Sequence, residues 1–180
     1  MKRVLKEILS TSIYILIVLI CTFLLVRFVV QRTEVVGSSM ENTLSNGDQL
    51  FVEKLSYRFS EPKRFDVVVF PFRYEEKIFY IKRIIGLPGE TVQIDEEGNI
   101  LIDGEILKES FGKEVIENPG LAYRPIVLGE DEYFVLGDNR NDSSDSRDPS
   151  VGNIKRDELI GKAWLRIWPF SEFGWISHGE

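Results

Sequence analysis

The sequence contains very little of the two side chains that most often bind metals or activate a serine. One of its 180 residues is a cysteine, Cys21, and one is a histidine, His178. An intrachain disulfide is therefore excluded, and a zinc site would lack most of its usual ligands. We expect chemistry without a metal or cofactor. A serine nucleophile in this chain would need a base other than histidine, and lysine is the next side chain to consider.

Long apolar runs are also scarce, with one exception near the N-terminus. Residues 8–26 contain no charge, and residues 28–30 extend the apolar run. A membrane-spanning helix needs roughly 20 such residues. Lys2, Arg3 and Lys6 precede the run, which predicts a cytoplasmic N-terminus. The alternative is a cleaved signal peptide, whose apolar region is shorter, about 7–15 residues. We predict an uncleaved anchor over residues 1–32.

The rest of the chain is acidic. Residues 1–32 hold five of the 22 basic and one of the 29 acidic side chains, so residues 33–180 carry a net charge of −11. Nucleic-acid-binding domains are usually basic, and no nucleic acid is expected as a partner. Residues 33–180 are instead predicted to form a solvated extracytoplasmic domain.

The pattern beyond the anchor favours strands. Short runs rich in apolar and β-branched residues are bounded by turn formers. The predicted strands are 48–53, 66–70, 77–85, 91–94, 132–136 and 163–167, with a hairpin over 100–107. Residues 108–129 are predicted to be irregular, and residues 157–160 to form one helical turn. The fold class is therefore mainly β.

Three polar patches stand out against this background, and each has an ordinary explanation. Ser39 could belong to a linker after the anchor. Lys82 lies in an apolar strand, where a lysine usually protects a sheet edge. Residues 137–147 could form a solvated loop or a calcium loop, although two arginines argue against calcium.

Taken together, the patches resemble the type I signal peptidases of bacteria, membrane-anchored Ser/Lys proteases that remove signal peptides from exported proteins. The family's serine motif, Ser-Met-x-Pro-Thr-Leu, is similar to residues 39–44. Its lysine motif, Tyr-[Ile/Val]-Lys-Arg-[Ile/Val]-[Ile/Val]-Gly-Leu-Pro-Gly, is met by residues 80–89. Its Gly-Asp-Asn-Arg…Ser-x-Asp-Ser-Arg box is met by residues 137–147. One anchor and a small ectodomain look most like the compact Gram-positive form.

The resemblance implies a site and a fold. Ser39 would be the nucleophile and would offer its backbone N–H to the oxyanion, while Lys82 would be the general base. Ser143 matches the serine that hydrogen-bonds the lysine, and Asp145 and Arg147 match an ion pair that braces the site. Asp138 would support the same loop. The implied fold is a coiled β-sheet catalytic core with a smaller inserted β lobe near residues 95–130.

The implied setting is the bacterial cell membrane, crossed once, with the catalytic domain outside. The expected partners are preproteins that carry signal peptides, the lipid bilayer and, transiently, the export translocon. Substrate pockets for small side chains are expected from Val35, Met40 and Ile84. The apolar neighbours expected to lower the pKa of Lys82 are Tyr80, Ile84, Phe134 and Leu136.

Two positions depart from the family pattern. Gly37 stands where some members have a serine whose hydroxyl is a second oxyanion donor. Asn42 replaces the usual proline, and we expect Asn42→Pro to raise stability or activity because proline fixes φ near −65°. A related Ser/Lys peptidase with one dedicated substrate is the nearest rival, and Asn42 is compatible with an inactive binding homologue.

Aromatic residues are concentrated near the C-terminus. They are Trp164, Trp168, Phe170, Phe173 and Trp175. The ordinary explanation is a last strand with core aromatics. The alternative is a rim that touches the membrane, because tryptophan favours membrane interfaces.

Overall fold

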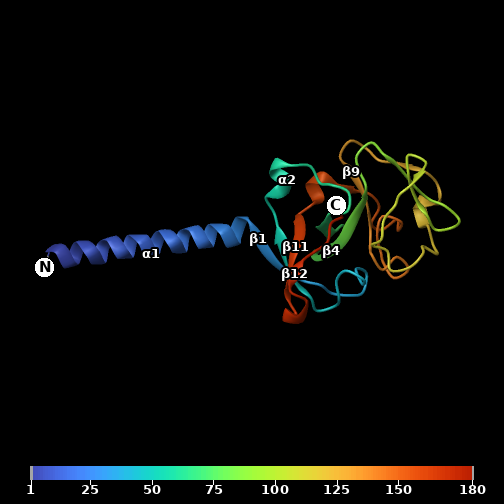
Figure 1. Ribbon diagram of the computed structural model, residues 1–180. Coiled ribbons are helices and arrows are strands. Elements are labelled where there is room, and N and C mark those ends of the chain that lie inside the picture. Colours follow the sequence, from blue (N-terminus) through green and yellow to red (C-terminus); the bar gives the residue numbers. More distant parts are fainter. Residues whose placement is uncertain (1, 180) are drawn as a thin grey trace.

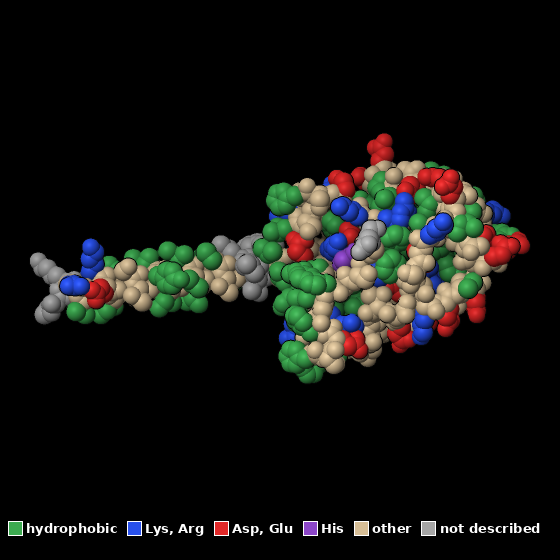
Figure 2. Space-filling model, viewed as in Figure 1, with side chains coloured by type: hydrophobic (Ala, Val, Ile, Leu, Met, Phe, Trp, Pro, Cys, Tyr) green, Lys and Arg blue, Asp and Glu red, His purple; other side chains and the backbone are tan. Residues whose placement is uncertain are grey.

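The computed structural model describes residues 2–179. Its first element is a long helix, α1 (Lys2–Phe28), which projects from the rest of the molecule (Figure 1). The stretch Lys6–Phe23 has a mean hydropathy of 1.8 and is not buried. Apolar side chains are therefore exposed along the helix (Figure 2). A helix of this length and composition can cross a bilayer.

The body is built on an eight-stranded antiparallel sheet. The strand order is β1-β2-β11-β3-β4-β9-β10, and β12 pairs with β11. The strands are β1 (Val30–Glu34), β2 (Gln49–Glu53), β3 (Val67–Phe72), β4 (Glu75–Gly86), β9 (Glu132–Leu136), β10 (Ile154–Lys155), β11 (Gly161–Trp168) and β12 (Gly174–Trp175). β4 is an interior strand, because it pairs with β3, where Lys82 lies opposite Val68, and with β9 from Arg83 onward. The edge position considered for this lysine is therefore wrong.

A second sheet of four strands is inserted between β4 and β9. Its order is β7-β6-β5-β8, and it forms a lobe beside the main sheet (Figure 1). The strands are β5 (Thr91–Ile94), β6 (Ile100–Ile102), β7 (Glu105–Ile106) and β8 (Ile126–Val127). β5 therefore lies before residues 95–130, the range predicted for the inserted lobe.

The prediction of a mainly β fold behind an N-terminal helix is confirmed. The remaining elements are short: α2 (Ser56–Phe59) and three 3₁₀ helices, η1 (Gly120–Tyr123), η2 (Arg156–Glu158) and η3 (Phe170–Glu172). The turn expected at 157–160 corresponds to η2. Four strands, β1, β8, β10 and β12, were not predicted. β1 begins within the apolar residues that prolong the helical run, and the other three are two residues long, too short to show a pattern.

Three clusters of buried apolar side chains hold the body together. One lies beneath the loop between β1 and β2 and includes Ile81 of β4. A second surrounds Ile84 and Tyr133, and a third, around Ile85 and Phe134, joins the two sheets. Each large apolar side chain buried in this way contributes about 1.5–3 kcal/mol. β4 contributes to all three clusters, which fixes the strand that carries Lys82.

Candidate active site

Ser39 lies in the loop between β1 and β2. Three apolar side chains of this loop, Val35, Met40 and Leu44, are at most 4% exposed. They pack in the cluster beneath the loop together with Ile81. The burial of these neighbours holds the half-buried Ser39 at the edge of the core, beside β4.

Lys82 reaches Ser39 from β4. Its side chain is almost completely buried, and Nζ donates to Ser39 Oγ (2.8 Å) and to the carbonyl oxygen of Ile81 (3.0 Å). Burial disfavours the charged ammonium and lowers the pKa of Lys82 from its ordinary 10.5 to about 8. The negative charges of Asp145 and Asp138 act in the opposite direction but are outweighed. Much of Lys82 is therefore neutral at mildly alkaline pH.

The apolar surroundings of Lys82 agree only in part with the expectation. Tyr80 and Ile84 lie on the same face of β4 as Lys82, and the Tyr80 ring centroid is 5.0 Å from Nζ. Phe134 and Leu136 pack instead in the cluster between the two sheets. Leu136 pairs with the residue after Lys82 and so lies on the other face. Those two neighbours were predicted wrongly.

The segment after β9 approaches Ser39 from a third direction. Asn139 N–H donates to the carbonyl oxygen of Ser39 (3.0 Å). A Cβ at Gly137 would lie 2.2 Å from Ser143 Oγ and 2.4 Å from Ser39 O, so only glycine fits between them. Ser143 lines the same cleft as Lys82. Its hydroxyl has no hydrogen-bond partner among the described residues, so the expected bond to Lys82 is not formed.

Asp145 and Arg147 form a two-bond ion pair behind this segment. Arg147 Nε donates to Asp145 Oδ1 and Nη2 to Oδ2, each at 2.8 Å. Asp145 Oδ2 also accepts the N–H of Gly137 (3.1 Å), and Arg147 Nη2 donates to the carbonyl oxygen of Arg140 (2.5 Å). The pair therefore fixes the path of the backbone on both sides of Ser143.

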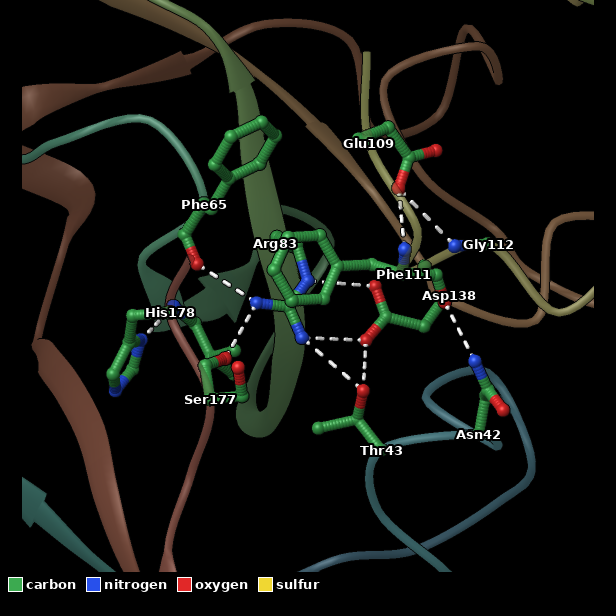
Figure 3. A network of polar contacts seen from close by, with 12 residues as sticks. Asn42, Thr43, Phe65, Arg83, Glu109, Phe111, Gly112, Asp138, Ser177 and His178 are labelled. Carbon is green, nitrogen blue, oxygen red and sulfur yellow. Dashed lines mark hydrogen bonds and ion pairs between the residues drawn. The ribbon is translucent and has the colours of Figure 1, made fainter. Parts of the chain in front are cut away.

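A second buried ion pair joins β4 to the same segment (Figure 3). Arg83 Nε and Nη2 donate to the two oxygens of Asp138 at 2.9 and 2.7 Å, and both side chains are fully buried. Thr43 Oγ1 donates to Asp138 Oδ2 (2.5 Å). Arg83 Nη1 donates to the carbonyl oxygens of Phe65 and Ser177. This network connects the loop of Ser39, the strand of Lys82 and the segment of Ser143.

No role for Arg83 was predicted from the sequence. The sequence feature that could have indicated a role is the position of this arginine in an apolar strand, on the face opposite to Lys82. A buried arginine requires a carboxylate partner, but Asp138 is far away in the sequence and only the pairing of β4 with β9 brings it close.

Ser39 and Lys82 open onto a cleft of about 710 Å³. Of the three side chains expected to contact substrate, Val35 and Met40 line this cleft. Ile84 does not, because it is fully buried in a core cluster. Within residues 2–179 no group of three or more His, Cys, Asp or Glu side chains is arranged to hold a metal ion.

The two departures from the motif pattern have distinct structures. Asn42 has a φ of +94°, which proline cannot adopt. The expectation that Asn42→Pro raises stability or activity is therefore wrong. Gly37 also has a positive φ, +96°, and its N–H donates to Asn46 Oδ1 (2.8 Å). Gly37 consequently has neither a hydroxyl nor a free amide to offer.

Comparison with known proteins gives a consistent result. Residues 6–168 match the protein family described as "Signal peptidase, peptidase S26". The "Probable signal peptidase I-2" of Synechocystis is 39% identical over 155 residues, covering 83% of this chain and 68% of that protein. "Signal peptidase I T" of Bacillus subtilis is 36% identical, covering 88% and 84%. "Signal peptidase IB" of Staphylococcus aureus is 32% identical, covering 93% of each.

Proposed function

Because the chain belongs to the signal peptidase family, peptidase S26, we propose that it removes signal peptides from exported preproteins with Ser39 as nucleophile and Lys82 as general base. The observation that carries this assignment is the 2.8 Å contact between Lys82 Nζ and Ser39 Oγ. It is made by a lysine whose burial favours the neutral form. A neutral amine within hydrogen-bond distance is what a serine hydroxyl needs to become a nucleophile.

The first half of the reaction forms an acyl-enzyme. Neutral Lys82 takes the proton of Ser39 while Oγ attacks the carbonyl carbon of the scissile bond. The negative charge that develops on the carbonyl oxygen is stabilised by the backbone N–H of Ser39. The C–N bond then breaks, and Lys82 passes its proton to the amine of the mature protein. The signal peptide remains as an ester on Ser39.

The second half consumes water. A water molecule gives a proton to Lys82 and attacks the ester carbon. Collapse of this intermediate breaks the bond to Ser39 Oγ, which recovers a proton from Lys82. The signal peptide leaves with a carboxyl group, and the dyad returns to its starting state.

Four further residues support the dyad in this proposal. Asp145, Arg147 and Asp138 hold the segment after β9 through the two buried ion pairs. The Ser143 hydroxyl lines the cleft and is unpartnered among the described residues. We propose that it accepts a hydrogen bond from Lys82 when the amine is protonated during the reaction, which would steady the ammonium group.

Val35 and Met40 are the proposed contacts for the small side chains of the signal peptide, because both line the cleft beside Ser39. Both side chains are almost fully buried, so we propose that they form the floor of shallow pockets. Shallow apolar pockets suit substrates with small residues at positions −1 and −3.

The long apolar helix supports a membrane-bound setting. We propose that α1 anchors the protein in the bacterial cell membrane and that the basic residues at its start keep the N-terminus in the cytoplasm. Residues 33–180 would then form the extracytoplasmic peptidase domain. A substrate whose signal peptide lies in the bilayer presents its cleavage site on that side. A transient contact with the export translocon stays a prediction.

Exposed aromatic side chains favour a contact between this domain and the lipid surface. Trp168, Phe170, Phe173 and Trp175 are each at least 47% exposed. They belong to η3, β12 and the chain around them, and apolar side chains gather on the side of the body that α1 enters (Figure 2). Trp164 differs, because it is half-buried against Trp175 with ring centroids 4.7 Å apart. If residues 33–180 with Trp168→Ser and Trp175→Ser bind liposomes as well as the parent domain, the lipid contact is refuted.

The function is tested with the purified full-length chain in detergent and a preprotein that carries an Ala-x-Ala site. The parent is expected to cleave after this site, and Ser39→Ala is expected to be inactive. No cleavage by the parent, or equal cleavage by Ser39→Ala, would overturn the proposal. Processing of several unrelated preproteins would exclude an enzyme with one dedicated substrate.

A further inference from the structure

The turn after the nucleophile has a backbone conformation that few side chains adopt. Thr43 N–H donates to the carbonyl oxygen of Met40 (3.0 Å) and closes a four-residue turn. Asn42 is the third residue of this turn and has a φ of +94°. A positive φ at the third position is typical of a type II turn, where glycine and asparagine are preferred. Asparagine therefore suits this turn, and the family's proline would not.

The side chain of Asn42 also reaches the smaller lobe. Its Nδ2 donates to the carbonyl oxygen of Phe111 (3.0 Å), in the connection between β7 and β8 (Figure 3). The Phe111 ring lies over the guanidinium group of Arg83 at 3.7 Å from its centroid and contacts the ring of Phe65. The N–H of Phe111 donates to the carboxylate of Glu109 (2.6 Å). The acceptor for Asn42 is therefore fixed from several directions.

The same connection makes further contacts with the site. Lys113 N–H donates to the carbonyl oxygen of Asp138 (2.8 Å). The Lys113 ammonium pairs with Glu41 in the nucleophile loop (2.8 Å), but both side chains are about 40% exposed. Glu109 pairs with the buried guanidinium of Arg140 (2.8 Å). Of the two side-chain links between this connection and the nucleophile loop, the one from Asn42 reaches a buttressed backbone atom, whereas the ion pair joins two exposed side chains.

We infer that Asn42 is a positioning residue for Ser39 and that Phe111 of the lobe is the support that holds it. Asn42 acts in two ways, by tolerating the positive φ and by tying the turn to Phe111. A turn that relaxed would move Met40, the buried residue next to Ser39, and with it the hydroxyl and the backbone N–H of Ser39. This inference rests on the proposed role of Ser39 as nucleophile.

Four substitutions at one position separate the two contributions. Asn42→Gly keeps the backbone conformation and loses the bond to Phe111, and Asn42→Asp replaces the donor with an acceptor. We expect kcat on the preprotein to fall about fivefold for each, the effect of losing one net hydrogen bond. Asn42→Ala loses both contributions and should fall about 20-fold. Asn42→Pro should fall more than about 100-fold, because proline cannot adopt the required φ.

Two readouts distinguish positioning from a merely structural role. kcat is expected to fall by a larger factor than KM changes, because the displaced Ser39 hydroxyl acts in the chemical step, and the pH midpoint of the reaction should not move, because Lys82 is not altered. Lys113→Ala is the matched control: it removes the exposed link between the same two segments and should change kcat by less than about twofold. Amide hydrogen exchange at Thr43 should be faster in Asn42→Gly and Asn42→Asp than in the parent.

Parental kcat and parental exchange in both Asn42→Gly and Asn42→Asp would overturn the inference, as would an active Asn42→Pro. It would also be overturned if the losses of kcat disappeared when each variant is assayed at the same distance below its melting temperature. A parent that cleaves no preprotein would refute the proposed function instead, and exchange at Thr43 would still test whether Asn42 holds the turn.

Discussion

The two faces of β4 surround two neighbouring basic side chains with opposite environments. Lys82 and Arg83 are both buried, at 3% and 0% exposure. On one face, Lys82 contacts a hydroxyl and a carbonyl oxygen, and no carboxylate of the described residues is within ion-pair distance of it. On the other face, Arg83 is held by both oxygens of Asp138 and by two carbonyl oxygens.

The effect of burial on a cation depends on whether a counter-ion is present. Without a counter-ion, the cost of burial is avoided by releasing the proton, so the pKa of Lys82 falls and the side chain becomes a base. With a counter-ion in two-bond geometry, Arg83 stays charged and becomes an anchor for three segments. The residue types match these tasks, because lysine can deprotonate in a protein and arginine cannot.

The largest effect is expected when the face of β4 that carries Lys82 is given a permanently charged guanidinium, as the opposite face has in Arg83. In Lys82→Arg, a guanidinium that stays protonated replaces the base, and we expect kcat/KM for a preprotein to fall at least about 10⁴-fold. Lys82→Met serves as the control, since it removes the amine without adding a charge and should be equally inactive but well folded by circular dichroism. Residual activity above about 1% of the parent in either variant would mean that another group serves as the base.

The next largest effect is expected from removing the counter-ion on the opposite face. Asp138→Asn leaves the Arg83 cation buried and unpaired, which should lower the free energy of unfolding by about 3–5 kcal/mol. The measurement is denaturant unfolding of the full chain in detergent. The double variant Arg83→Met with Asp138→Leu should recover much of this loss, because it removes both charges. A loss below about 1 kcal/mol in Asp138→Asn would show that the pair is not an anchor.

The same two residues show how far the sequence could predict this molecule. The strands at 66–70, 77–85 and 132–136 followed from local apolar runs, and Ser39 and Lys82 followed from motifs. Contacts that depend on strand register or on a backbone angle could not be predicted from a pattern. The partner of Arg83 required the pairing of β4 with β9, and the φ of Asn42 contradicted the proline of the motif.

A smaller effect, which tests the Lys82 face alone, is expected from pH. Protonated Lys82 cannot accept the proton of Ser39, so kcat/KM should rise about tenfold per pH unit and level off above the lowered pKa of Lys82, about 8. The check is a pH profile of preprotein cleavage, corrected for stability with the unfolding midpoint at each pH. A plateau reached only near pH 10.5, the ordinary value for lysine, would mean that burial does not act on Lys82 as inferred.

The smallest effect is expected at His178, a partly buried side chain that lies beside Arg83. Its Nδ1 accepts the N–H of Val67 (3.2 Å), and burial, with the charges of Lys162 and Arg83, lowers its pKa to about 4, against the opposing charge of Asp66. The unfolded chain takes up this proton near pH 6.5 and the folded chain only near 4. Stability should therefore fall as pH drops through this window, by at most about 1.4 kcal/mol per unit.

His178→Asn provides the test, because the amide oxygen can still accept the bond from Val67 but cannot titrate. Its free energy of unfolding should match that of the parent near pH 7 and should decline less between pH 6.5 and 4. His178→Phe, which has no acceptor, should be less stable than both at pH 7 because the N–H of Val67 loses its partner. Equal acid slopes in the parent and His178→Asn would show that the pKa of His178 is the same in the folded and unfolded chains, and that burial beside Arg83 does not lower it.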